Sequence, residues 1–220
     1  MDLNCAIFDL DGTLVDTVDA HVLSWTEACR RMGITDVSRN ELISLFGRTS
    51  IDIAKEILRA RSISLTKAEQ LSSIKDKLFE ECYVVKVRRL PGAKEVLSFL
   101  KSRGVKVVIV SSNPRSVITK MLVATDLKEY VDLIIGQDDV SKGKPSPEPI
   151  LKALSYLKAR PEDAIMVGDS IYDVQASIKA GVLAIGIATG VSSPIDLLRA
   201  GARFVVMDLY ELKRLLEYLL

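Results

Sequence analysis

The sequence contains few of the residues that stabilise small secreted proteins or build thiolate metal sites. Its three cysteines, Cys5, Cys29 and Cys82, are far apart and lie in apolar or helical segments. This odd number and wide spacing exclude a disulfide framework and a zinc-type ligand pattern, so we expect buried, reduced thiols. There is also little net charge, since 30 basic and 29 acidic side chains leave a formal charge of +1. That balance argues against a nucleic-acid or anionic-membrane partner.

Long hydrophobic runs are absent as well. No basic segment followed by a long apolar stretch opens the chain, and an acidic side chain interrupts the first apolar run at Asp9. The sequence therefore predicts neither a secretion signal nor a membrane span, and we expect a cytoplasmic protein. With 220 residues, 48% of them hydrophobic and 27% charged, the chain can form one large globular domain or two unequal ones. We expect a monomer or a small homo-oligomer.

The second half of the chain alternates short apolar runs with amphipathic segments. The apolar runs are rich in β-branched residues, as in strands buried on both faces of a parallel sheet, and cover 105–110, 132–135, 164–168 and 182–188. Helical patterns follow at 115–124, 147–158, 171–180 and 194–201, and Gly104 and Gly181 stand where helices should end. This alternation predicts an α/β fold with a three-layer, doubly wound parallel sheet, Rossmann-like, to which the strand at 4–8 must also belong.

Residues 17–89 follow a different pattern. This segment contains no convincing strand run, and its apolar residues recur at helical spacing on faces that begin at Val22, Ile51 and Leu71. Trp25 lies on the first of these faces and is expected in the core between the helices. The segment therefore predicts a group of packed helices.

The turn Leu-Pro-Gly at 90–92 marks the return to the α/β pattern. We therefore predict an all-helical domain at 16–89, inserted into a discontinuous α/β core of 1–15 and 90–220. Two chain crossings between such domains permit a rigid-body movement hinged near the crossings.

Chemically active side chains follow the predicted strands at their carboxyl ends, where the active sites of open α/β sheets lie. They are Asp9, Asp11, Gly12 and Thr13 after the first strand, Ser111, Ser112 and Asn113 after the next, Lys142 and Lys144 before the helix at 147, and Asp169 and Asp173 after the strand at 164–168. Four acids, two hydroxyls and at least one lysine are therefore expected at one edge of the sheet.

Four carboxylates at one edge need a counter-charge. Two like charges about 5 Å apart cost roughly 3 kcal/mol at an effective dielectric constant of about 20, so either a cation binds or carboxyl pKa values rise. Mg²⁺ fits best, because it takes a few protein carboxylates and completes its shell with water and substrate phosphate. Lys144 would add a fixed positive charge, while Ser111 and the amides near Gly12 and Ser112 would donate hydrogen bonds to an anion.

The two neighbouring acids of the first strand can take distinct tasks. A carboxylate can attack phosphorus to form an acyl-phosphate, and a second carboxyl can protonate the leaving group and then deprotonate water. Asp9 ends the strand and is our nucleophile, while Asp11 lies on the same side by the two-residue period and is our acid/base. Taken alone, the tetrapeptide from Asp9 to Gly12 is more simply interpreted as an ordinary polar turn. The polar residues expected after the other strands at the same edge of the sheet outweigh that interpretation.

The motifs "DLDGTLVDT", "VIVSS", "GKPSPEP" and "GDSIYD" resemble, in that order, the four motifs of the haloacid dehalogenase superfamily. The resemblance covers essentially the whole chain, including a helical cap between the first two motifs. It implies Asp9 as nucleophile and Asp11 as acid/base, with Ser111 and Lys144 binding the phosphate. It also implies Mg²⁺ held by Asp9, the Asp11 carbonyl and Asp169, with Asp173 supporting the site. Members of the phosphoglycolate phosphatase and β-phosphoglucomutase types are most similar.

Several residues have a structural alternative. Lys144-Pro145 matches the family pattern, so we expect Lys144 to bind the phosphate and Lys142 to be a solvated lysine of the loop. We interpret Asp16 as a helix cap rather than a site residue, and Asp138 and Asp139 as a solvated loop pair.

Two cap residues remain open between function and structure. His21 lies where mutase-like members also carry a histidine, yet it is equally explained as a half-exposed helical residue. The loop "FGRTS" at 46–50 contains Gly47, which would let it bend over the site, and Arg48, which could clamp a second anionic group of the substrate. A solvated Arg48 before an N-cap at Thr49 or Ser50 has about equal weight.

Together, the motifs predict an Mg²⁺-dependent phosphatase that acts on a small phosphorylated metabolite. A β-phosphoglucomutase-like transferase is the nearest alternative, although Asp169 stands alone where mutases carry two adjacent acids. The sequence after Ser111 also lacks the lysine and asparagine of a mutase, for which Arg115 could substitute in part. A dehalogenase would lack Asp11, and a non-catalytic binding module would have lost motif residues that are all present here.

Overall fold

The computed structural model describes residues 3–46 and 48–220, so Gly47, the glycine expected to let the 46–50 loop bend, lies outside the described residues. The chain divides into two compact units. One consists of residues 1–16 and 88–220, and the other of residues 17–87. We call them the sheet unit and the helical unit and describe each by itself.

The sheet unit contains a six-stranded parallel sheet with the order β5-β4-β1-β6-β7-β8. Its strands are β1 (Cys5–Phe8), β4 (Lys106–Val110), β5 (Leu133–Ile135), β6 (Ala164–Gly168), β7 (Leu183–Ile187) and β8 (Phe204–Val206). In the centre, Ile7 of β1 is in register with Val108 of β4 on one side and Met166 of β6 on the other. The chain therefore builds outward from β1 in both directions, which leaves a crevice at its carboxyl end.

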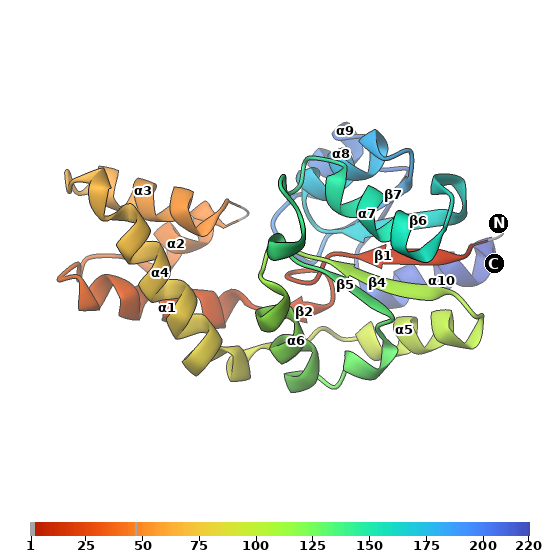
Figure 1. The fold of residues 1–220 in the computed structure, drawn as a ribbon, viewed down its shortest axis with the longest axis horizontal. Coiled ribbons are helices and arrows are strands. Elements are labelled where there is room, and N and C mark those ends of the chain that lie inside the picture. The colour runs from red at the N-terminus through yellow and green to blue at the C-terminus, as the bar shows by residue number, and fades with distance from the viewer. Residues whose placement is uncertain (1–2, 47) are drawn as a thin grey trace. The chain divides into compact units, whose positions relative to one another are not determined.

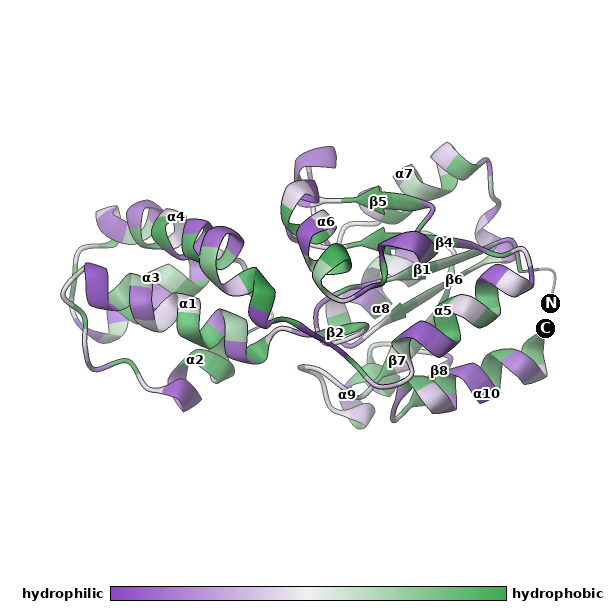
Figure 2. Ribbon diagram, turned by 90° about the horizontal axis from the view of Figure 1, so that it is seen from below, coloured by the Kyte–Doolittle hydropathy of each residue, from purple (hydrophilic) through white to green (hydrophobic). Residues whose placement is uncertain are grey.

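Helices cover both faces of this sheet (Figure 1), with α7 and α8 on one face and α5 and α10 on the other. The helices of the unit are α5 (Ala93–Ser102), α6 (Arg115–Ala124), α7 (Glu148–Leu157), α8 (Ile171–Lys179), α9 (Pro194–Arg199) and α10 (Leu209–Leu219). Cys5 and Ile7 pack with Ile150 of α7 and Ala176 of α8 in one apolar cluster. Because both faces are covered, the central strands are mainly hydrophobic, as Figure 2 shows, and apart from Lys106 at the start of β4 they carry no charged residue.

The predicted α/β class with a doubly wound parallel sheet is confirmed, and the expected strands and helices lie within two residues of the observed ones. Gly104 and Gly181 have φ angles of 75° and 74°, the left-handed conformation that ends a helix. The sequence did not identify α5, β8 or α10. The strand β8 is as short as β5, but it fully buries only Val206, whereas β5 buries both Ile134 and Ile135.

A short antiparallel ribbon corrects two expectations. Val15–Asp16 (β2) pairs with Arg88–Arg89 (β3), so the stretch thought to lack strands ends in one. Asp16 belongs to this ribbon, and the N-cap residue of the following helix is Thr17. Two-residue strands carry no hydrophobic alternation, and only their pairing across the fold defines them.

The helical unit contains α1 (Val18–Arg31), α2 (Arg39–Leu45), α3 (Ser50–Ala60) and α4 (Ala68–Leu78), continued by a π-helical turn at Phe79–Tyr83. Trp25 is 1% exposed in the core between these helices, as expected. The sequence did not identify α2, whose seven residues bury only Leu42. The side chain of Ser38 accepts a hydrogen bond from the Glu41 amide and caps it.

All three cysteines are free thiols, but they are not all buried. Cys5 and Cys29 lie in apolar cores, whereas Cys82 is exposed in the π-helical turn, contrary to expectation. Apolar spacing placed Cys82 on an extended α-helical face, and the change to π-helical geometry moves it out of that face. Within residues 3–46 and 48–220, no helix combines the length and the apolar character needed to cross a membrane.

Candidate active site

The candidate site forms at the carboxyl ends of the three central strands. Asp9 directly follows β1, Ser111 follows β4 and Asp169 follows β6. Their exposed fractions are 7%, 6% and 3%, so these polar residues are buried although each lies just beyond a strand. Parallel strands in register place their ends together, which explains how positions about 100 and 160 residues apart in sequence meet.

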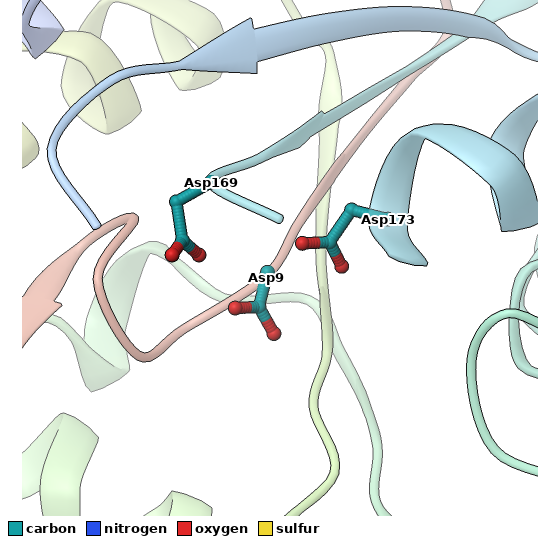
Figure 3. Close-up of side chains that lie close together, drawn as sticks. All are labelled: Asp9, Asp169 and Asp173. Carbon is teal, nitrogen blue, oxygen red and sulfur yellow. The ribbon is translucent and has the colours of Figure 1, made fainter. Parts of the chain in front are cut away.

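Three carboxylates converge at this point (Figure 3). One oxygen each of Asp9, Asp169 and Asp173 lies within 4.8 Å of the others, and all three residues are buried. Asp173 comes from the first turn of α8, where its Oδ2 accepts hydrogen bonds from the Ser170 amide and hydroxyl at 3.1 and 2.6 Å. This capping box orients Asp173 and leaves its Oδ1 directed toward the cluster.

Lys144 supplies the positive charge of the cluster. Its Nζ lies 2.7 Å from Asp9 Oδ1 and 2.6 Å from Asp173 Oδ1, and it also donates to the Val110 carbonyl at 3.2 Å. The Lys144 side chain is 7% exposed, whereas Lys142 is an exposed residue. The structure therefore brings Lys144 and not Lys142 to the carboxylates, in agreement with the sequence interpretation.

One lysine does not balance three buried carboxylates, and the pKa values reflect this. Burial raises the pKa of Asp9 well above its ordinary value. The charge of Lys144 lowers this pKa, but the negative charges of Asp173, Asp169 and Asp11 raise it again. Burial and the charge of Asp173 raise the pKa of Asp169 to about 6. The same carboxylates raise the pKa of Lys144 despite its burial. The cluster therefore favours an additional cation.

Asp11 is held by an amide. Its Oδ2 accepts a hydrogen bond of 2.7 Å from Asn113 Nδ2, which also donates to the Ser111 hydroxyl at 3.3 Å. The Asn113 backbone amide donates to the same hydroxyl at 3.2 Å. Asn113, expected to bind substrate, thus also connects the acid/base candidate with the predicted phosphate-binding serine. Ser112, the other expected donor, is exposed at the same edge.

Thr13 and Ser170 contact the carboxylates. Thr13 was expected at this edge without a specific role, and Ser170 was not expected there. The Thr13 hydroxyl donates to Asp169 Oδ1 at 3.2 Å, and Ser170 holds Asp173 as described above. Their only signal in the sequence is their position inside the "DGT" and "GDS" motifs. Gly12, also predicted for this site, has a φ of 74° and lies against Asp169, where a Cβ would be 2.8 Å from Oδ2.

Asp138 is exposed and Asp139 is partly exposed, as expected for a solvated loop pair, but both also bind Arg115. Asp138 Oδ1 accepts from the Arg115 amide at 2.9 Å, and the Asp139 carboxylate binds the Arg115 guanidinium at 3.0 and 3.1 Å. Asp139 also accepts from the Gly136 amide. These contacts fix the start of α6 and occupy Arg115, the residue that could have helped a mutase to hold a second phosphate.

Arg48 and His21 belong to the helical unit. The Arg48 side chain is half exposed, 3.7 Å from Glu56 Oε1, and Thr49 beside it is the N-cap of α3. His21 stacks on Phe79 with ring centroids 4.3 Å apart, which agrees with a structural role for its ring.

With this geometry in place, comparison with known proteins identifies the family. The family model for haloacid dehalogenase-like hydrolases matches residues 6–187. The chain belongs to this family. The resemblance inferred from the four motifs is thereby confirmed, and the chain is an enzyme of the hydrolase class.

Individual relatives agree. A protein provisionally named pyrophosphatase PpaX from Caldanaerobacter subterraneus is 32% identical over 99% of this chain and 96% of its own length. A phosphoglycolate phosphatase from Aquifex aeolicus is 31% identical over 80% of each chain. A crystal structure of a provisionally named β-phosphoglucomutase from Thermotoga maritima is 27% identical, with a TM-score of 0.79, over 99% of this chain and all of that one. The phosphatase names among these relatives support a phosphatase-type enzyme.

Proposed function

We propose that this haloacid dehalogenase-like hydrolase is an Mg²⁺-dependent phosphatase that hydrolyses a small phosphorylated metabolite through a phosphorylated Asp9. The observation that supports it most is the contact of Lys144 with both Asp9 and Asp173 beside Asp169. A nucleophile, a fixed cation and further ligand oxygens lie together at the end of β1. The proposal also places the enzyme in the cytoplasm, which agrees with three free thiols.

In the first step, a carboxylate oxygen of Asp9 attacks the phosphorus atom of the substrate. The bond from phosphorus to the ester oxygen breaks, and that oxygen leaves with the bonding electron pair. Asp11, in its protonated form, gives its proton to the leaving oxygen, so an alcohol departs and Asp11 becomes a carboxylate. Asn113 orients Asp11 for this transfer through its amide.

In the second step, the Asp11 carboxylate takes a proton from a water molecule, whose oxygen attacks the phosphorus of phospho-Asp9. The bond between phosphorus and the Asp9 oxygen breaks, inorganic phosphate leaves, and both aspartates regain their starting states. Lys144 and the donors around Ser111 remain in place and hold the phosphoryl oxygens in both steps.

The residues present fit a magnesium ion. Asp9 and Asp169 would provide carboxylate oxygens, Asp11 its backbone carbonyl, and Asp173 would support the site while it holds Lys144. Hard oxygen donors are what Mg²⁺ prefers. The pKa values of Asp9 and Asp169 are raised because burial and neighbouring carboxylates disfavour their charged forms, which a bound cation would stabilise. When bound, the ion supplies charge that keeps these carboxylates ionised and offsets the charge of the transferred phosphoryl group.

A β-phosphoglucomutase-like transfer is the second candidate, because a structure provisionally given that name is similar over the full length. Two observations favour hydrolysis instead. Asp169 is followed by Ser170, not a second acid, and Ser170 is occupied in holding Asp173. Arg115 is occupied by Asp139.

The test is a panel of phosphorylated compounds with and without Mg²⁺. Phosphoglycolate, pyrophosphate and sugar monophosphates are compared for phosphate release, and β-glucose 1-phosphate is followed for glucose 6-phosphate formation. We expect stoichiometric phosphate release that requires Mg²⁺ and no bisphosphate activator. Faster isomerisation of glucose 1-phosphate than hydrolysis of any compound would establish the mutase, and full activity in excess chelator would refute the metal dependence.

A further inference from the structure

The segment Thr189–Ser192 follows strand β7 and lies against two residues of the candidate site. Thr189 Oγ1 donates a hydrogen bond of 2.6 Å to the Gly12 carbonyl. The Val191 amide donates to Asp169 Oδ2 at 2.8 Å, and the Ser192 amide donates to the Asp169 carbonyl at 3.2 Å. This segment therefore connects the loop after β1 with the loop after β6.

The Asp169 carboxylate lies between two glycines. A Cβ on Gly12 would be 2.8 Å from Asp169 Oδ2, and a Cβ on Gly190 would overlap the same oxygen. A Cβ on Gly12 would also be 3.2 Å from the Gly190 Cα. No side chain fits at either position unless Asp169 or the segment moves, because a Cβ cannot approach other atoms so closely.

Both oxygens of Asp169 are thus fixed. The Thr13 hydroxyl holds Oδ1, the Val191 amide holds Oδ2, and the two glycines restrict the plane of the carboxylate between them. In this orientation Asp169 has an oxygen within 4.8 Å of Asp9 and Asp173. The segment itself offers no carboxylate to the cluster. Its contacts with the site are those with Asp169 and Gly12, and the Ser192 hydroxyl also accepts a hydrogen bond of 3.2 Å from the Ile171 amide at the start of α8.

We propose that Thr189–Ser192 is a positioning segment that fixes Asp169 in the orientation required to ligate the metal ion. This rests on the proposed function, because it takes Asp169 as a metal ligand. Hydrogen-bond partners behind a metal ligand commonly change metal affinity or activity by about 10- to 100-fold when they are removed. The segment should therefore set metal affinity while it leaves the chemistry at Asp9 largely unchanged.

The experiment compares Thr189→Val, which removes only the hydroxyl, and Gly190→Ala, which adds only a methyl group. Thr119→Val is the matched control, because Thr119 is also half-buried and its hydroxyl donates to a backbone carbonyl, that of Arg115. Asp169→Ala is the reference for loss of the ligand. Metal affinity is measured without substrate, by electron paramagnetic resonance of Mn²⁺ and its displacement by Mg²⁺, and the metal-free melting temperature reports the fold.

We expect Gly190→Ala to weaken Mg²⁺ binding by about tenfold or more and Thr189→Val by less. The metal-free melting temperature of Thr189→Val should lie near that of the wild type, whereas Gly190→Ala should melt lower, because its methyl group must displace Asp169 or the segment. Activity at saturating Mg²⁺ should be retained in Thr189→Val, so that the KM for Mg²⁺ rises more than kcat falls. Affinities equal to that of Thr119→Val in both variants would overturn the inference.

If the wild type and Asp169→Ala bind the metal equally, Asp169 is no ligand and the positioning role is refuted with it. This result differs from failure of the proposed phosphatase activity, which would appear as intact metal binding without phosphate release from any compound.

Discussion

The two units of this protein handle charge in opposite ways. In the helical unit, Arg61 is mostly buried and donates to both oxygens of Glu41 at 2.7 and 2.9 Å and to Asp36 at 2.8 Å. Lys75, also buried, meets Asp76 at 3.1 Å and lies over the Trp25 ring. These cations are neutralised by nearby carboxylates, as in a structural scaffold.

In the sheet unit, three buried carboxylates face one ammonium, and the pKa values of Asp9 and Asp169 rise as a result. Buried charge without full compensation costs stability, so a fold retains it where a ligand or a reaction uses it. This difference supports our proposal that the chemistry of this enzyme lies in the sheet unit. The predictions below test that division, beginning with the largest expected effect.

Asp9→Asn should abolish phosphate release, by about a thousandfold or more, because an amide cannot act as the nucleophile. The metal-free melting temperature should not fall, since the change removes one of several clustered negative charges. Phosphate release and a thermal melt measure the two effects. Asp126→Asn is the control, because Asp126 is exposed and its left-handed φ of 55° suits asparagine. Appreciable turnover by Asp9→Asn would remove Asp9 from the mechanism.

The raised pKa of Asp169 predicts a pH dependence of the metal-free protein. Because the folded pKa is about 6 and the ordinary value is 3.8, the folded state binds the proton more tightly between these pH values. Its contribution to the free energy of unfolding is therefore present below pH 3.8 and is lost as the pH rises to about 6, by up to about 3 kcal/mol. Asp169→Asn has no such group.

We therefore expect the wild type to lose stability relative to Asp169→Asn as the pH rises from about 4 to about 6, measured by denaturant unfolding in chelator. Saturating Mg²⁺ should reduce this trend in the wild type, because a cation stabilises the ionised carboxylate. If the difference in unfolding free energy between the wild type and Asp169→Asn does not change with pH, the pKa of Asp169 is not raised in the folded protein.

Lys144→Met should lower kcat/KM by about a hundredfold, because it removes the fixed positive charge from the site where phosphoryl charge develops. Lys142→Met removes an exposed lysine two residues earlier and should have little effect. Circular dichroism shows whether Lys144→Met is folded. Equal losses in the two variants would mean that the contacts of Lys144 with Asp9 and Asp173 serve no catalytic purpose.

The smallest effect concerns the helical unit. If Arg48 clamps a second anionic group of the substrate, Arg48→Ala should lower kcat/KM by about tenfold, which corresponds to about 1.4 kcal/mol. Arg59→Ala is a close control, since Arg59 pairs with the same Glu56. Unchanged kinetics on the best substrate would mean that Arg48 does not bind substrate. The helical unit would then have only a structural role at this position, unlike the sheet unit.

Local patterns in the sequence were sufficient for most strands and helices of the sheet unit, although not for α5, β8 or α10, and for the residues at its edge. Strands that are buried on both faces appear as continuous β-branched runs, and their ends mark where polar residues can meet. The same patterns gave the wrong environment for Cys82 and missed the strand pairing of Asp16 and the Arg115 contacts of Asp138 and Asp139. Each of these depends on a turn geometry or a distant partner, such as the Arg115 contact of Asp139.

The sequence by itself determined the fold class, the four motifs and the candidates Asp9, Asp11, Lys144 and Asp169, because these follow from hydrophobic periodicity and from residue type. Only the tertiary structure decided which carboxylate oxygens of the site accept hydrogen bonds and which groups donate them. Contacts such as Asn113 to Asp11, Ser170 to Asp173 and Val191 to Asp169 join loops from different strands or depend on a specific helix cap. A backbone amide leaves no pattern in sequence. A glycine such as Gly190 is visible there, but its close approach to Asp169 exists only once the chain has folded.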